Sequence, residues 1–204
     1  MRAGVTHDSH YAEGIIGGEK RMWRNSVHGW GLPSILLHWL SAVLVVSLFV
    51  LGWWMTGLGY YDRWYQLAPW WHKSLGLTLL GVTLLRLAWR LVQPTPKAHG
   101  LSWERMLAHA GHCLLYVLLL TVMVSGYLIS TAEGQGISVF GVFEVPALIS
   151  ELPNQATLAG DVHWYAAWAL IVLAVGHTLA ALKHHIFDRR DTLRRMWWPG
   201  GSRR

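Results

Sequence analysis

The chain has little charge and almost no cysteine. Only 14% of its 204 residues are Asp, Glu, Lys or Arg, whereas a soluble domain carries about a quarter. The single cysteine, Cys113, excludes an intramolecular disulfide, and no C-x-x-C-H motif is present for covalent attachment of a haem. Any haem bound by this chain must therefore be held by axial ligands alone.

What remains is strongly apolar. Hydrophobic residues make up 53% of the chain, and 14 residues are tryptophan. Four runs contain few charges, and each is long enough to cross a bilayer as a helix, which takes about 20 residues. We therefore predict an all-α integral membrane protein, a four-helix bundle with spans at about residues 32–56, 70–92, 104–130 and 161–186.

The predicted spans lie in a membrane domain at 31–188. Residues 1–30 are polar, Gly-rich and without hydrophobic periodicity, so we predict a disordered N-terminal extension. Residues 189–204 form a basic tail. The net charge of +6 does not indicate nucleic-acid binding, because the positive residues are distributed over several connections rather than gathered on one soluble face.

The distribution of Lys and Arg predicts the orientation in the membrane. The third connection, 131–161, has neither residue, and the first has only Arg63, with Lys73 just beyond it. The N-terminal segment, the second connection and the tail are rich in both. The positive-inside rule then places both termini and the second connection in the cytoplasm. The apolar third connection is expected to hold a short amphipathic element at the outer leaflet.

Histidines are numerous for this length, twelve in all, and two of them share the last span. His163 and His177 are 14 residues apart, so on a helix they are separated by about 21 Å and return to within about 40° of the same face. Their depths then lie near opposite sides of a hydrocarbon core roughly 30 Å thick. A histidine within a membrane is costly without a partner, which indicates a functional role.

Depth sorts the other histidines into two levels. The outer candidates are His72 and His163. The inner candidates are His38, His177, His109 and His112. Two levels, each shared by facing helices, are typical of sites built in the core of a helix bundle. Depth alone does not separate His38 from His112 as the inner partner of His177. His109 and His112 are equally consistent with hydrogen bonds to a cofactor, proton relay, a quinone site or ordinary contacts between helices.

The ligand types favour a haem over other metal centres. A structural zinc takes four protein ligands, usually with cysteine or carboxylate, and a di-iron site needs carboxylates, which are absent from the middle of the spans. Two histidines in an apolar shell suit a planar cofactor that supplies four nitrogens of its own. Arg86 follows His72 by 14 residues on the same helix face, so we expect Arg86 to meet propionates of an inner haem and Lys73 those of an outer one. An ordinary positive-inside role for Arg86 is the alternative.

Small residues at Ser125 and Gly126 indicate close contact of the third span with a neighbouring helix.

Several short motifs together resemble the bacterial cytochrome b561 family over about residues 32–197. The motifs are Leu37-His38-Trp39-Leu40, His72-Lys73-Ser74-Leu75-Gly76, Pro94-Thr95-Pro96, Leu107-Ala108-His109-Ala110-Gly111-His112 and His184-His185-Ile186-Phe187. The resemblance implies a four-helix protein of the bacterial inner membrane with two non-covalent haem b groups, one held by His38 and His177 and the other by His72 and His163.

The resemblance also implies electron transfer between the quinone pool and another donor or acceptor. A member of the family oxidises superoxide while reducing ubiquinone, and the likeness makes the same activity an expectation here. The sequence itself gives no support for it, because the third connection offers no positive charge to attract an anion. The alternative is a cytochrome subunit that anchors a separate dehydrogenase or hydrogenase through its outer face. A metal-ion transporter is disfavoured, because mid-membrane carboxylates and broken helices are missing.

Overall fold

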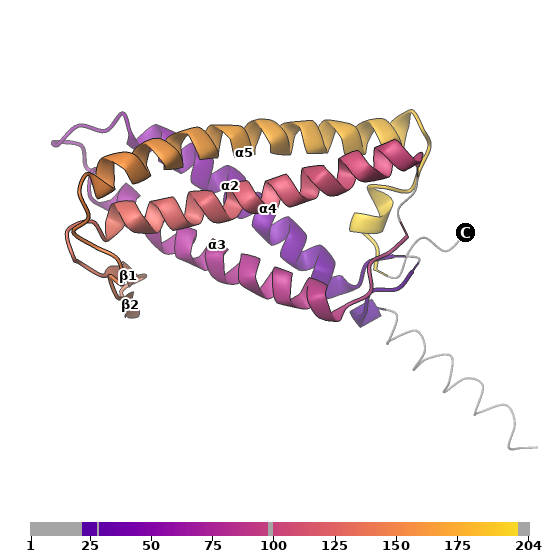
Figure 1. Cartoon of the computed structure of the whole chain (residues 1–204), viewed down its shortest axis with the longest axis horizontal. Coiled ribbons are helices and arrows are strands. Elements are labelled where there is room, and N and C mark those ends of the chain that lie inside the picture. The colour runs from indigo at the N-terminus through magenta and orange to yellow at the C-terminus, as the bar shows by residue number, and fades with distance from the viewer. Residues whose placement is uncertain (1–21, 28, 98–99, 200–204) are drawn as a thin grey trace, which may run out of the picture. The chain divides into compact units, whose positions relative to one another are not determined.

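The computed structural model describes residues 22–27, 29–97 and 100–199, and it is mostly helical (Figure 1). The long helices are α2 (Leu32–Met55), α3 (Leu67–Val92), α4 (Ser102–Ser130) and α5 (Gln155–Ile186). The shorter elements are β1 (Ile137–Val139), β2 (Phe143–Val145) and the 3-10 helix η1 (Arg194–Met196). All four long helices are long and apolar enough to cross a membrane, as the sequence predicts.

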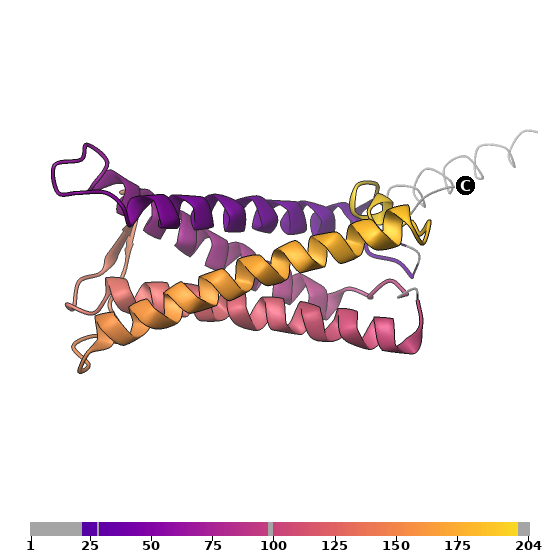
Figure 2. The same ribbon diagram turned by 90° about the horizontal axis from the view of Figure 1, so that it is seen from above.

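The described chain divides into two compact units. The main unit comprises Leu40–Leu84 and Gly100–Leu179, and the terminal unit comprises Met1–Trp39, Leu85–His99 and Ala180–Arg204. In the main unit the four helices run side by side, and α5 crosses α4 obliquely (Figure 2). The hairpin of β1 and β2 lies at one end of this unit (Figure 1).

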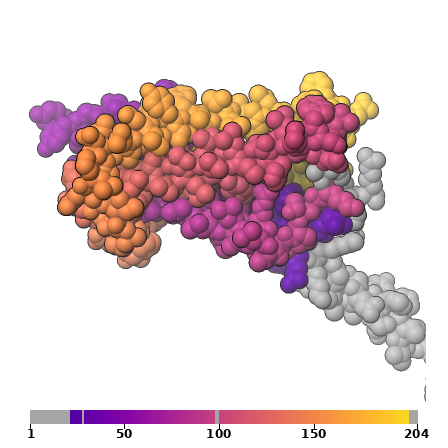
Figure 3. Space-filling model, viewed as in Figure 1, coloured from indigo at the N-terminus to yellow at the C-terminus, as the bar shows by residue number. Residues whose placement is uncertain are grey.

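Every long helix contributes to one apolar core in the main unit. The buried residues of this core are Leu44, Leu48, Leu79, Leu119, Met123 and Leu170. The outward faces are apolar as well: Val43, Val117 and Val172 are each more than half exposed. Side chains of α4 and α5 form the outer surface along the face shown in Figure 3. An apolar exterior around a small core is the pattern of helices that contact lipid.

Helix α5 begins before the predicted span. It starts at Gln155, six residues before the predicted position 161. Gln155 is only 7% exposed, and its side-chain amide donates to the carbonyls of Leu128 (2.9 Å) and Ile149 (3.2 Å). A polar residue that sequence analysis assigns to a connection is therefore a buried anchor, because its hydrogen bonds are made to the preceding connection and to α4.

The third connection contains a β-hairpin where the sequence predicted a short amphipathic element. Ile137 pairs with Val145 and Val139 with Phe143. The turn has positive φ at Phe140 (50°) and Gly141 (70°), and the Val142 N–H donates to the Val139 carbonyl at 2.9 Å. These are the features of a type I′ turn, whose twist suits a tight hairpin and whose conformation favours glycine.

Tyr127 fixes the same connection to α4. Its hydroxyl donates to the Pro146 carbonyl at 2.8 Å and accepts from the Leu148 N–H at 2.7 Å. The backbone polar groups of an apolar, irregular segment are thus satisfied by the protein, as they must be near hydrocarbon.

The terminal unit is ordered close to α2. Asn25 is 7% exposed, and its side-chain oxygen accepts from the Gly31 N–H (2.9 Å) and the Ser34 hydroxyl (2.7 Å). Asn25 thus makes specific hydrogen bonds within the extension predicted at residues 1–30, of which residues 1–21 and 28 lie outside the described part. The basic tail returns to α2, because the Trp39 indole donates to the Met196 carbonyl at 2.8 Å; residues 200–204 of that tail also lie outside it.

Replacement of Leu79 by alanine tests the core of the main unit. Leu79 is 3% exposed, whereas Leu84 on the same helix is 53% exposed. We expect Leu79→Ala to lower the free energy of unfolding by about 2–5 kcal/mol through the cavity that it leaves, and Leu84→Ala to have a much smaller effect. Thermal unfolding in detergent micelles measures both. Equal losses in the two variants would contradict the packing described here.

Candidate functional site

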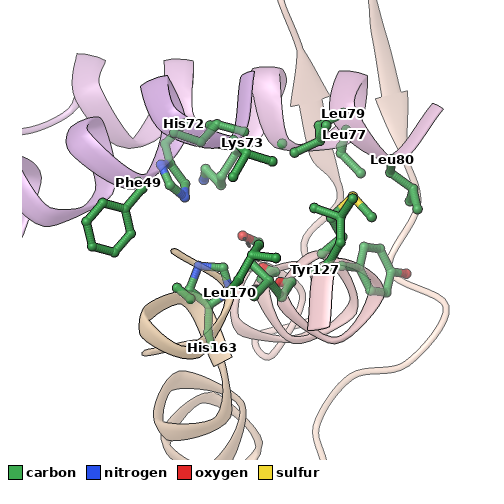
Figure 4. Close-up of a pocket in the computed structure, with 18 of the residues that line it drawn as sticks. Phe49, His72, Lys73, Leu77, Leu79, Leu80, Tyr127, His163 and Leu170 are labelled. Carbon is green, nitrogen blue, oxygen red and sulfur yellow. Dashed lines mark hydrogen bonds between the residues drawn. The ribbon is translucent and has the colours of Figure 1, made fainter. Parts of the chain in front are cut away.

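Two predicted ligands face each other in the main unit. His72 of α3 and His163 of α5 have ring centroids 6.1 Å apart and ring planes 71° apart, and they point toward one another across a pocket (Figure 4). Two imidazoles that bind one metal ion at about 2 Å from each nitrogen have centroids roughly 6 Å apart. The observed spacing therefore fits one metal ion between the rings.

The pocket around the pair is lined by all four helices and by the hairpin. It encloses about 760 Å³ between its walls, a value that includes space open to the outside. Its walls are mainly apolar, with contributions from residues such as Leu48, Leu80, Met123, Leu170 and Ile171. Lys73, Tyr127 and Ser130 add polar groups. An apolar cleft with a few polar groups is the usual form of a cofactor site.

Hydrogen bonds orient His163. Its Nδ1 lies 2.9 Å from the Val122 carbonyl oxygen and 3.3 Å from the Ser125 hydroxyl. A carbonyl only accepts, so Nδ1 carries the hydrogen and donates it, which leaves the lone pair on Nε2. Histidines that bind metals commonly have this arrangement, in which a backbone carbonyl fixes the tautomer and the ring orientation. Ser125 was predicted as a helix contact, but its role beside His163 was not.

The Nδ1 atom of His72 is held differently. It is buried and has no hydrogen-bond partner among the described residues. A buried polar atom without a partner costs about 1–3 kcal/mol and needs an explanation. The two facing imidazoles of His72 and His163 are a donor set that fits a metal cofactor, and a group bound beside His72 would give its Nδ1 a partner.

The predicted inner residues fall into the two units. In the terminal unit, Arg86 Nη2 lies 2.9 Å from His38 Nδ1. Because a guanidinium only donates, this nitrogen of His38 accepts, and the hydrogen of the neutral ring lies on Nε2. His163 is in the opposite tautomer. In the tautomer of His38, Nε2 carries the hydrogen and has no lone pair for a metal, so His38 could bind a metal through Nε2 only after its hydrogen bond with Arg86 is broken. The spacing argument predicted Arg86 near a haem but not this contact with His38.

In the main unit, His112 lies against His177. Their ring centroids are 5.1 Å apart with planes 66° apart, an edge contact about 1 Å closer than the outer pair. His109 is exposed, with Nε2 3.7 Å from the Cys113 sulfur on its own helix. The structure thus brings His112 to His177 and leaves His109 apart from them. The pairing of His38 with His177 stays a prediction.

The histidines at the end of α5 take part in local contacts. His184 Nδ1 hydrogen-bonds the Asp188 carboxylate, and this bond lowers the pKa of Asp188 from its usual value, with Lys183 adding to the effect. His185 Nδ1 lies 3.0 Å from the Arg190 carbonyl. These contacts connect the last turn of α5 to the segment that follows it.

The hairpin forms part of the pocket wall through Ser74. Ile137 of β1 lines the pocket, and the Phe140 N–H donates to the Ser74 hydroxyl at 3.1 Å. Ser74 is fully buried and follows His72 by two residues. The hairpin is therefore fixed to α3 one turn or less from a predicted ligand.

Replacement of Ser74 by alanine tests whether its hydroxyl fixes the hairpin to α3. Ser74→Ala leaves the Phe140 N–H without its acceptor, so we expect amide exchange at Phe140 to accelerate by about tenfold or more. Ser130→Ala is the matched control, because the Ser130 hydroxyl bonds only the Gly126 carbonyl of its own helix among the interactions described. Hydrogen exchange measured by mass spectrometry distinguishes the two. Unchanged exchange at Phe140 in Ser74→Ala would contradict the assignment.

Comparison with known proteins agrees with this site. The family model described as prokaryotic cytochrome b561 matches residues 29–199. Cytochrome b561 homolog 2 of Escherichia coli (strain K12) is 47% identical over 180 residues, which cover 87% of this chain and 96% of that protein. The probable superoxide oxidase CybB of Yersinia pestis is 30% identical over 169 residues, 80% of this chain and 92% of that protein.

A more distant relative is similar over almost the same length. Cytochrome b561 homolog 1 of Escherichia coli (strain K12) is 26% identical over 176 residues, 80% of this chain and 93% of that protein. Four membrane-capable helices and this family match indicate a bacterial multi-pass membrane cytochrome, for which the family implies haem b as cofactor. The chain belongs to the prokaryotic cytochrome b561 family.

Proposed function

We propose that this chain carries electrons across the bacterial inner membrane through two haem b groups and exchanges them with the quinone pool. The observation that carries the proposal is the pair of His72 and His163, whose rings are 6.1 Å apart in an apolar pocket. A haem supplies one-electron redox chemistry when it is bound. His72 and His163 would hold the haem from two helices, and a haem bound by two histidines would supply electron transfer more readily than binding of oxygen.

The surroundings of the pair suit this role. The Val122 carbonyl holds His163 in one tautomer. The same hydrogen bond would make His163 Nε2 a stronger electron donor to a bound iron, which would favour the oxidised iron. The apolar lining from four helices would limit the reorganisation of solvent that accompanies electron transfer at a bound haem. Lys73 lies in the pocket wall directly after His72, where its ammonium group is suited to a haem propionate.

The second haem is assigned to His38 and His177 by the family resemblance, since depth alone does not separate His38 from His112. Arg86 is the proposed propionate partner, and its present contact with His38 shows that it reaches the end of α2 within the terminal unit. His112 is the alternative ligand to His38, supported by its contact with His177. His109 and His112 otherwise serve in proton transfer or at a quinone.

The distribution of Lys and Arg supports cytoplasmic termini, and in that orientation the pocket of His72 and His163 would lie toward the outer side.

A second candidate function, superoxide oxidation coupled to ubiquinone reduction, is favoured by the relative named probable superoxide oxidase CybB. Two superoxide ions would each give one electron and leave as oxygen, and ubiquinone would take both electrons with two protons. The competing role is that of a cytochrome subunit for a separate dehydrogenase or hydrogenase at the outer face.

A visible spectrum of the purified protein with a pyridine haemochrome assay tests the proposal. We expect a low-spin b-type spectrum after dithionite reduction and two haems per chain. The preparation should reduce or be reduced by a soluble ubiquinone analogue without another subunit. One haem would refute the inner or the outer pair. Absence of haem would refute electron transfer, and quinone activity only with a copurified dehydrogenase would favour the subunit role.

Substitution of Arg86 tests its place beside the inner haem. Removal of a cation favours the oxidised form, so we expect Arg86→Gln to lower one of the two midpoint potentials by an amount on the order of tens of millivolts. Arg90→Gln, one turn further along α3, is the control and should shift both potentials much less. Potentiometric titration of the visible bands measures both variants. Equal shifts would support the positive-inside role alone.

A further inference from the structure

Each histidine of the outer pair lies against a glycine of a neighbouring helix. A Cβ atom at Gly52 of α2 would lie 2.9 Å from His72 Cε1. At Gly126 of α4, it would lie 3.0 Å from His163 Cε1 and 3.2 Å from Nδ1. Real Cβ atoms essentially never approach another heavy atom more closely than 3.0 Å, so a side chain at Gly52 requires the ring to move.

Other helical glycines do not share this contact. A Cβ atom would have nothing within 4 Å at Gly76, Gly81, Gly111, Gly160 or Gly176. Glycine inside a helix is about 1 kcal/mol less favourable than alanine. Helix propensity therefore opposes glycine at positions 52 and 126, and close approach of an imidazole gives a specific reason for it at both.

The two contacts differ in what else holds the ring. His163 is also oriented by the Val122 carbonyl and the Ser125 hydroxyl. The Nδ1 of His72 has no hydrogen-bond partner among the described residues. Hydrogen bonds therefore resist rotation of His163, while the position of His72 depends on the shape of the surface around it. Gly52 forms part of that surface, where a Cβ atom would lie 2.9 Å from the ring.

We propose that Gly52 and Gly126 are positioning residues that set the separation of the two imidazoles, and that Gly52 is the more critical of the two. The inference rests on the proposed role of His72 and His163 as ligands of one haem. The glycines do not touch the metal. They allow α2 and α4 to approach α3 and α5 closely enough for the rings to stand 6.1 Å apart. A methyl group at position 52 displaces His72 and thereby weakens or breaks its bond to the iron.

The test compares Gly52→Ala and Gly126→Ala with two controls, Gly81→Ala of α3 and Gly111→Ala of α4. Each purified variant is assayed for haem per chain, for its low-spin spectrum, and for binding of carbon monoxide to the reduced protein. We expect Gly52→Ala either to lose one haem or to retain it in a form that binds carbon monoxide, because an axial position is open. Gly126→Ala should keep both haems with a shifted potential, and the controls should match the wild type.

A second comparison separates positioning from packing. Gly52→Ala is combined with His72→Ala and compared with His72→Ala alone. If Gly52 acts through the His72 ring, the added methyl leaves haem content unchanged in the His72→Ala background, because the shared partner is already gone. It should raise the midpoint of thermal unfolding there by the gain in helix propensity alone, as Gly81→Ala does in the wild type. This comparison also applies if Gly52→Ala alone gives little folded protein, since the double variant should then be at least as stable as His72→Ala.

Two results would overturn the inference while leaving the proposed function intact. One is a Gly52→Ala protein with two low-spin haems, wild-type potentials and no carbon monoxide binding. The other is an equal loss of stability from Gly52→Ala with and without His72. A wild-type protein without haem would instead overturn the proposed function on which the inference rests.

Discussion

The main unit must accommodate two imidazole rings that face each other in apolar surroundings. A histidine away from water is costly unless a partner satisfies it, and the main unit brings two of them to within 6.1 Å of each other. His163 recovers part of the cost through the Val122 carbonyl. The Nδ1 of His72 recovers none from the described residues. A metal cofactor that binds both rings would satisfy them at once, so ligand and fold are expected to stabilise each other.

The other helices and the hairpin support this arrangement through packing and hydrogen bonds. Helices satisfy their own backbone polar groups, so apolar side chains are free to face lipid on one side and a small core on the other. Leu79 and Leu170 pack beneath the pocket from the two helices that carry the histidines. Ser74 fixes the hairpin to α3, and Tyr127 fixes the following segment to α4. Gly52 and Gly126 have no side chain at the points where the imidazole rings lie against α2 and α4.

Local patterns in the sequence predicted the parts that repeat along a helix. The four spans and the common face of His163 and His177 follow from apolar length and from 3.6 residues per turn. Contacts between distant segments were not predictable in this way. Examples are the hydrogen bond between Arg86 and His38 and the fit of Gly52 to His72. Asn25 was predicted to lie in a disordered extension and Gln155 in a connection, because both are polar. In the structure both are buried, and their side chains hydrogen-bond Ser34 and the Leu128 carbonyl respectively.

The most direct measurement is a low-temperature electron paramagnetic resonance spectrum of the oxidised protein and of two variants, His72→Ala and His163→Ala. If both residues bind one iron, the two variants lose the same low-spin signal and keep the other unchanged. His185→Ala, whose ring contacts the Arg190 carbonyl instead, serves as the control and should retain both signals. Loss of a different signal in each variant, or of neither signal in one of them, would contradict a shared iron between His72 and His163.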